Sequence, residues 1–170
     1  MHPSEITWRA GVDVLCFGGT KNGLPVGEAV VFFDKALATD FAYRLKQAGQ
    51  LALKMRFISV PWLGLLDDDV WLRNARHANA MARLMAECLA GLPGVRLMFQ
   101  PEANSVFAEF PAQVATALRA RGWRFYQFIG SGGCRLIRLM CAWDTKRETV
   151  EHFASWTRSV HCARGAERED

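Results

Sequence analysis

The segment that most constrains the fold of this chain is a glycine-rich loop at residues 18–27. Its sequence, GGTKNGLPVG, holds four glycines and one proline. So many glycines predict backbone angles that other residues avoid, which indicates a loop. Apolar runs at 12–17 and 28–33 flank it, and their β-branched and aromatic residues are typical of strands. We expect these two strands to pair as antiparallel neighbours across the loop.

Lys21 lies inside this loop and is the candidate reactive residue. A lysine at a hairpin tip is ordinarily a solvated charge. Here the density of glycine and the apolar flanks predict a partly desolvated amine, which is the better nucleophile toward carbonyls that a Schiff base requires. The loop does not match the phosphate-binding pattern GxxxxGK(S/T), because Lys21 follows Thr20 and precedes Asn22. Nucleotide binding is therefore disfavoured.

Composition indicates a folded chain with a hydrophobic core. The chain has 170 residues, of which 51% are hydrophobic and 22% charged, and a net charge of +4. The positive charge is spread along the chain, so we expect no nucleic-acid partner. The N-terminus lacks the features of a signal peptide, and the apolar stretch 57–66 is half of a membrane span. We therefore expect a cytoplasmic protein with no membrane insertion.

The five cysteines show no C-x-x-C pair. Zinc sites and disulfide frameworks have tighter, paired spacing. The pattern predicts reduced thiols, most of them small core residues, and no metal site.

Two segments of the first half show helical periodicity. Asp34 is expected to cap a helix over 35–48, and the acidic triplet 67–69 is expected to begin the longest helix, which ends at Gly91. An apolar stripe on this longest helix predicts packing, through Val70, Asn74, Ala78, Met81, Met85, Cys88 and Leu89. The stretch 51–66 is less periodic and contains Pro61, so it is predicted to be a connection, with or without a helical turn, that packs against another part of the chain.

The second half alternates strands and helices. A helix is expected to start at Pro111 and stop at Gly122, and a capping box at 145–148 opens a last helix. Residues from about 161 are polar and are expected to fray. Four strands are predicted, at 95–99, 104–110, 123–129 and 134–143. This order favours an α+β layer of sheet and helices.

Six collinear segments give the chain a family resemblance. Residues 11–23, GVDVLCFGGTKNG, running on into 26–33, VGEAVVFF, resemble the pyridoxal-phosphate lysine region of the low-specificity L-threonine aldolases, in the aromatic amino acid β-eliminating lyase/threonine aldolase family. Five more matches follow in order, at 43–50, 54–57, 75–82, 121–123 and 140–145. The resemblance extends from about residue 6 to residue 160, and six collinear matches make it highly specific.

The resemblance implies a fold and its boundaries. The family has the aspartate-aminotransferase (fold type I) architecture in chains about twice this long, so the chain resembles only the C-terminal half. Residues 1–65 would end the cofactor-binding large domain of α/β type, 66–160 would form the small α+β domain, and 161–170 would be a polar tail. The Asp-Gly-Ala-Arg-like segment, whose aspartate pairs with the pyridine nitrogen, is not found in this sequence.

The resemblance also implies an activity. The enzyme would be a pyridoxal 5'-phosphate-dependent lyase that cleaves L-threonine and related β-hydroxy amino acids to glycine and an aldehyde by retro-aldol Cα–Cβ cleavage. Lys21 would hold the cofactor as a Schiff base, and Thr20 would contact its phosphate. The full-length enzyme would be a homodimer or homotetramer. Because the aspartate that pairs with the pyridine nitrogen is missing, we expect the isolated chain to bind the cofactor poorly and to have little or no aldolase activity.

Two arginines compete for the substrate carboxylate. The family has one arginine before a Leu-Met-Cys-type run, but this chain reads RLIRLM at 135–140. Anchoring on Met140 selects Arg138, whereas anchoring on Gly132 and Gly133 selects Arg135. Three residues apart, the two lie on opposite faces of a regular strand, unless a bulge absorbs the extra residues.

Three alternatives stay open at this point. The chain could be a truncated, catalytically incomplete remnant of such an enzyme. It could be a related β-eliminating lyase that acts on aromatic amino acids, or a related serine/glycine enzyme of the same superfamily. A basic nucleic-acid-binding module would require a clustered Lys/Arg face.

Overall fold

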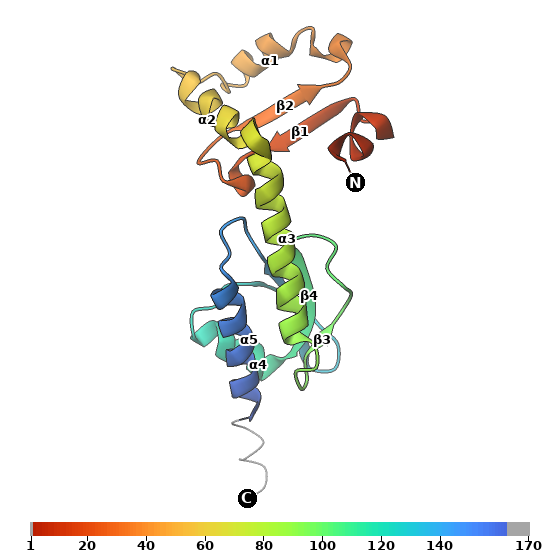
Figure 1. The fold of residues 1–170 in the computed structure, drawn as a ribbon, viewed down its shortest axis with the longest axis vertical. Helices are drawn as coiled ribbons and strands as arrows, with labels where there is room; N and C mark the ends of the chain where they lie inside the picture. The colour runs from red at the N-terminus through yellow and green to blue at the C-terminus, as the bar shows by residue number, and fades with distance from the viewer. Residues whose placement is uncertain (1, 163–170) are drawn as a thin grey trace, which may run out of the picture. The chain divides into compact units, whose positions relative to one another are not determined.

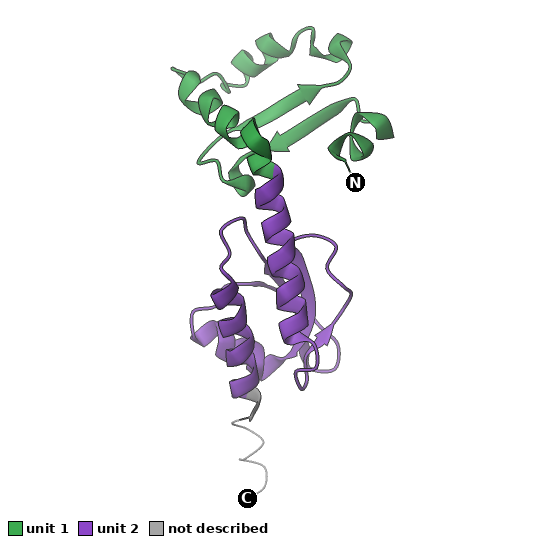
Figure 2. Ribbon diagram, viewed as in Figure 1, with its two compact units in different colours: residues 1–71 green, residues 72–170 purple. Residues whose placement is uncertain are grey.

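The computed structural model describes residues 2–162 of the chain. They fall into two compact units, Met1–Trp71 and Leu72–Asp170, which Figure 2 shows in separate colours. The boundary lies near the start of one long helix. Of the polar tail expected at 161–170, residues 163–170 lie outside the described residues.

The first unit is built on the predicted hairpin (Figure 1). Strands β1 (Val14–Gly18) and β2 (Glu28–Phe32) pair antiparallel, with Leu15 opposite Val31 and Gly18 opposite Glu28. Two short 3-10 turns precede them, at Pro3–Ile6 and Trp8–Ala10. The antiparallel pairing expected across the glycine-rich loop is confirmed.

The helices of the first unit differ from the sequence expectation. Asp34 does cap, through a 2.9 Å hydrogen bond from Ala36 N–H, but the predicted helix splits into a 3-10 turn, Lys35–Ala38, and α1 (Phe41–Gln47). The predicted connection over 51–66 is wrong in its second part, which forms α2 (Arg56–Leu66) with Pro61 inside. Tertiary packing outweighs the helix-breaking preference of Pro61. The ring centres of Trp62 and of Phe17 on β1 lie 5.4 Å apart.

The acidic triplet does not cap the longest helix as predicted. Asp67–Asp69 form a separate 3-10 turn, in which Asp68 and Asp69 have φ angles of 47° and 55°. Aspartate tolerates this left-handed region better than most side chains, so the triplet makes the sharp turn between two helices. The longest helix, α3, then runs from Val70 to Leu89.

The second unit is an antiparallel sheet with helices against it (Figure 1), as predicted. The strand order is β3-β4-β6-β5. The strands are β3 (Arg96–Leu97), β4 (Ser105–Pro111), β5 (Tyr126–Ile129) and β6 (Cys134–Met140). The remaining helices are α4 (Ala112–Ala120) and α5 (Arg147–Cys162).

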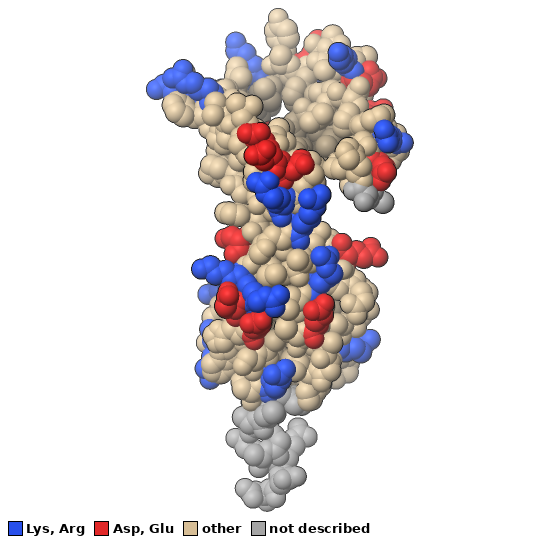
Figure 3. Space-filling view, viewed as in Figure 1, with Lys and Arg blue, Asp and Glu red and all other residues tan. Residues whose placement is uncertain are grey.

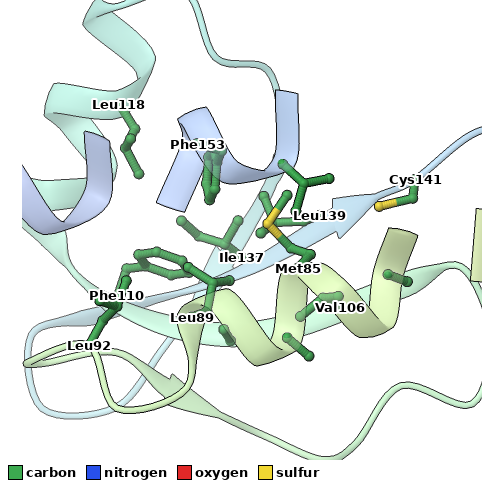
Figure 4. Packing of buried hydrophobic residues seen from close by; sticks show 14 of the residues in the cluster. Met85, Leu89, Leu92, Val106, Phe110, Leu118, Ile137, Leu139, Cys141 and Phe153 are labelled. Atoms are coloured by element: carbon green, nitrogen blue, oxygen red, sulfur yellow. The ribbon is translucent and has the colours of Figure 1, made fainter. Parts of the chain in front are cut away.

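One face of this sheet makes the core (Figure 4). Residues at alternate positions of β4 and β6, such as Phe110 and Ile137, are fully buried against α3, α4 and α5. The helix partners shown there are Met85, Leu89, Leu118 and Phe153. The stripe predicted on the longest helix is confirmed at its C-terminal end, where Ala78, Met81, Met85 and Leu89 are buried. The three described helices of the second unit all pack on this face, and the other face of the sheet is called the open face.

The side chains of four cysteines, all except Cys162, are described, and all four are free thiols. Only Cys141 of these four is buried, so the expectation that most cysteines are core residues is not met. Burial raises the pKa of the Cys141 thiol to about 11. Cys16 is exposed on β1. No helix among the described residues is long and apolar enough to cross a membrane.

Candidate functional site

The glycine-rich loop closes on itself through backbone hydrogen bonds. Gly19 N–H donates to Gly27 O at 3.3 Å, and Leu24 N–H donates to Gly19 O at 3.1 Å. Between these glycines, Thr20–Asn22 form a single 3-10 turn that ends at Gly23 with a φ of 107°. Lys21 therefore lies on a short turn with a fixed backbone.

Two glycines are needed for this packing. A Cβ on Gly19 would lie 2.5 Å from Leu24 Cδ1 and 2.9 Å from Trp62 Cζ2, closer than real Cβ contacts. Gly27 has a φ of 116°, and a Cβ there would meet both Ile58 and Trp62. Helix α2 can thus approach the loop only because these residues are glycines. The helix that sequence reasoning missed is therefore part of what holds Lys21.

Lys21 itself is exposed. The partial desolvation expected from its apolar flanks is therefore absent. Its neighbour Thr20 donates its hydroxyl hydrogen bond to Glu28 Oε1 at 2.9 Å. In this structure the Thr20 proton is thus directed at a carboxylate on β2.

The two arginines of β6 lie on opposite faces, as predicted for a regular strand. The β4–β6 ladder is unbroken from Ser105 opposite Met140 to Pro111 opposite Cys134, so no bulge shifts the register. Arg135 lies opposite Phe110, a core residue, and is therefore on the helix-covered face. Arg138 is on the open face.

Arg138 lies in a hollow that can hold a small anion. Its guanidinium carbon is 4.6 Å from the ring centre of Tyr126, which is directly opposite it on β5. Its Nε is buried and has no hydrogen-bond partner among residues 2–162. The hollow measures about 320 Å³ and is lined by Arg124, Phe125, Tyr126, Arg138 and Met140. Carboxylate and phosphate groups are the anions that a guanidinium with free donors binds through paired hydrogen bonds.

Arg135 has a different setting. It lines a shallow, wider hollow of about 890 Å³ on the other face, together with Arg119 of α4 and residues of β5. The Arg119 guanidinium already donates to Phe125 O at 3.2 Å. Over the visible face of this second unit, positive and negative side chains are interspersed (Figure 3).

Sequence reasoning missed two residues of this sheet. Tyr126 was assigned only to a strand, although cross-strand pairing would have placed it opposite an arginine. Glu109 of β4 is buried, and its Oε2 accepts from Arg96 Nη2 at 2.7 Å, while its Oε1 accepts from Ser131 N–H and Oγ. The Arg96 hydrogen bond, followed by those from Ser131, holds the pKa of Glu109 below its usual value. The signal for it was a lone carboxylate within an apolar strand.

The candidate residues therefore fall into two groups, each described within its own unit. Thr20 and Lys21 lie in the first unit, and Arg135 and Arg138 in the second. A family model described as beta-eliminating lyase matches residues 1–113, more than half of the chain. The chain belongs to the β-eliminating lyase family. The matched part of this family member includes the loop with Lys21 and ends before both arginines of β6.

Two curated relatives extend the similarity over nearly the whole chain. A low specificity L-threonine aldolase of Pseudomonas aeruginosa is 61% identical over 158 residues, and one of another Pseudomonas species is 58% identical over 161 residues. The matches cover 93% and 95% of this chain but 45% and 46% of the relatives. This β-eliminating lyase chain thus spans less than half the length of the relatives that it matches.

Solved structures agree on the fold. Threonine aldolase of Leishmania major matches with a TM-score of 0.80 at 24% identity, over 88% of this chain and 44% of that one. Serine palmitoyltransferase of Sphingomonas wittichii matches with a TM-score of 0.62 at 14% identity, over 92% and 41%. The fold is thus part of the fold type I architecture, as the resemblance implied. Enzymes of the β-eliminating lyase family, like serine palmitoyltransferase, depend on pyridoxal phosphate.

Proposed function

We propose that this chain carries the cofactor-binding lysine and the substrate-binding arginine of a pyridoxal-phosphate-dependent lyase. The enzyme would cleave L-threonine and related β-hydroxy amino acids to glycine and an aldehyde. The observation that carries this proposal is Lys21, held on a short turn by Gly19, Gly27 and Trp62 in a chain 61% identical to an L-threonine aldolase. Residues 1–65 would belong to the large domain and 66–160 to the small domain.

Lys21 has the access that its role needs. Its amine is exposed, so an aldehyde can reach Nζ without displacing protein atoms. The hydrogen bonds of the surrounding loop fix the backbone from which the side chain projects, which lowers the entropy cost of presenting the amine. When bound, the cofactor supplies the ring that accepts the electrons of the broken Cα–Cβ bond.

Arg138 is the stronger candidate for the substrate carboxylate. Its buried Nε–H lacks a partner within the described residues, and an unpaired buried donor favours any ligand that completes it. No carboxylate of the described chain lies within 4 Å of its guanidinium, so the charge is available for an anion. Arg135 lies on the opposite face, toward the helices, and we assign it no role in substrate binding.

Thr20 would be a second residue that contacts the cofactor, provided that its hydroxyl hydrogen bond changes partner. Its hydroxyl proton is directed to Glu28, and a phosphate beside that carboxylate would meet a like charge. Thr20 would therefore bind the phosphate only after its hydroxyl turns away from Glu28. The chain's residues fit part of the cofactor site, and no partner for the pyridine nitrogen is assigned among them.

The proposal is tested with a chimera. The N-terminal part of the Pseudomonas aeruginosa enzyme, up to the point where its match to this chain begins, is joined to this chain, and glycine formation from L-threonine is measured. We expect cleavage, and a loss of at least about a hundredfold in Lys21→Ala, the scale on which loss of a reacting side chain is felt. A chimera that folds and binds the cofactor but makes no more glycine than Lys21→Ala would refute the proposal.

A related β-eliminating lyase is the second candidate, because the description of the matching family model names that reaction. The same chimera decides between the two. Release of pyruvate and ammonia from tyrosine or tryptophan, without glycine from threonine, would favour the second candidate. If neither reaction occurs with a folded chimera, the chain is the catalytically incomplete remnant considered above.

A further inference from the structure

The open face of the second unit pairs an arginine with an aromatic ring. Tyr126 and Arg138 are directly opposite residues on the antiparallel strands β5 and β6. The guanidinium carbon lies 4.6 Å from the ring centre, within the range of a cation–π contact. Both side chains line the hollow of about 320 Å³. The ring therefore covers one side of the guanidinium, and the hollow lies beside both.

This contact leaves the hydrogen-bonding edge of Arg138 unused. A cation–π contact uses the face of a guanidinium, whereas its N–H donors lie in the plane. Nε is buried with no partner among the described residues, and Arg138 forms no ion pair within residues 2–162. An arginine side chain that no other contact constrains would turn such a donor toward water, because an unpaired buried donor is costly. The Tyr126 ring, with its centre 4.6 Å from the guanidinium carbon, is the side chain placed to hold this orientation.

We propose that Tyr126 is a positioning residue, which holds Arg138 in the orientation that receives the substrate carboxylate. This inference rests on the proposed role of Arg138. The ring, and not the phenol hydroxyl, provides the contact, so phenylalanine at position 126 should serve as well as tyrosine. The ring also shields one face of the guanidinium from water, which strengthens a hydrogen bond from its edge to an anion.

The neighbouring strand positions supply a matched control. Phe128 is two residues along β5, on the same face as Tyr126, and lies opposite Leu136 instead of an arginine. Its side chain is exposed to a similar extent, 47% against 63% for Tyr126. Phe128→Leu therefore removes a comparable ring from the same strand without touching Arg138.

The experiment measures carboxylate binding to the 170-residue chain by NMR of the arginine Nε–H groups. The Arg138 resonance is assigned by its loss in Arg138→Lys, and L-threonine is titrated with L-threoninamide, which has no carboxylate, as the control ligand. We expect L-threonine alone to shift the Arg138 resonance. Tyr126→Leu should weaken binding roughly two- to fivefold and remove the ring-current shift of Arg138. Tyr126→Phe and Phe128→Leu should behave as the unchanged chain does.

Each other outcome overturns a defined part of the account. If Tyr126→Leu binds L-threonine as tightly as the unchanged chain, Tyr126 does not position Arg138. If Phe128→Leu weakens binding as much as Tyr126→Leu, the effect is general to the strand and the inference fails. If L-threonine leaves the Arg138 resonance unmoved in the unchanged chain, the carboxylate role of Arg138 fails, and the inference fails with it.

Discussion

At the scale of a residue, the pairing register of β4 and β6 places Arg135 and Arg138 in different surroundings. The repeated Arg-Leu pattern offers two equivalent candidates, but the unbroken β4–β6 ladder puts one against the core face and the other on the open face. Of the two, only Arg138 combines a buried Nε–H that has no partner among residues 2–162 with a hollow of about 320 Å³. The difference is one of surroundings, since the two side chains are chemically identical.

The two arginines should therefore respond differently to the same substitution. In the chimera, Arg138→Lys is expected to raise the KM for L-threonine about ten- to a hundredfold, because lysine cannot donate the paired, charge-assisted hydrogen bonds of a guanidinium. Arg135→Lys, the matched control, should change KM by less than about twofold, as for a surface substitution. Steady-state kinetics of glycine formation gives both values. The reverse order would assign the carboxylate to Arg135.

At the scale of an element, Glu109 links strands β3 and β4 to the turn between β5 and β6. From β4 it accepts hydrogen bonds from Arg96 on β3 and from Ser131 in the turn between β5 and β6. The turn GSGG has glycines on both sides of Ser131, and two of them have positive φ angles. One carboxylate thus anchors a turn whose own backbone is permissive.

Glu109→Gln should destabilise the second unit at neutral pH. The folded-state pKa of Glu109 lies below its unfolded value of about 4.3, so its stabilising effect is present above that pH and is lost as pH falls through the folded pKa. Thermal melts at pH 7 should show a lower Tm for Glu109→Gln, and the gap from the unchanged chain should narrow as pH falls through the lowered folded-state pKa.

Glu151→Gln is the control for this experiment. Glu151 pairs with Arg147 at 3.2 Å on the exposed surface of α5, and such pairs contribute little. Its Tm should change by less than that of Glu109→Gln at pH 7. If Glu109→Gln has the same Tm as the unchanged chain at pH 7, the hydrogen bonds of Glu109 with Arg96 and Ser131 do not stabilise the fold.

Elements with a strong local signal were predictable from the sequence, whereas those set by packing were not. The hairpin strands around Lys21 and the stripe on α3 follow from alternation and helical spacing. Helix α2 was missed because Pro61 is a local breaker, and only the contact of Trp62 with Phe17 and the loop glycines overrides it. At the acidic triplet, helix-dipole reasoning favoured a cap, but left-handed angles at Asp68 and Asp69 make a turn instead. The exposure of Lys21 and the position of the Tyr126 ring beside Arg138 depend on tertiary structure. Neither periodicity nor a sequence motif predicts them.

At the scale of the whole molecule, the two units differ in how much core they have. Among the described residues, the first unit buries only Leu24 and Leu65 of its apolar side chains, and Phe57 and Leu63 of α2 are 67% and 69% exposed. The second unit has a contiguous buried cluster from five elements. The relatives are more than twice as long as the matched segment, and exposed apolar surface on this scale is typical of a docking face.

Hydrogen exchange should show this difference directly. In the isolated chain, amides of the β1–β2 ladder should exchange at least about a hundredfold faster than those of the β4–β6 ladder, because a two-stranded hairpin with little core opens readily. In the chimera, which supplies the rest of the fold, protection of β1–β2 should rise while that of β4–β6 stays the same. Equal protection of both ladders in the isolated chain would contradict the account.

The central claim is that Lys21 is the residue to which the cofactor attaches. The direct measurement is to load the chimera with pyridoxal phosphate, reduce it with borohydride and locate the resulting label by peptide mass spectrometry. We predict that the label lies on Lys21. Little label is expected on the other lysines of this chain, which are Lys35, Lys46, Lys54 and Lys146. Label spread over those lysines, with Lys21 unmodified, would contradict it.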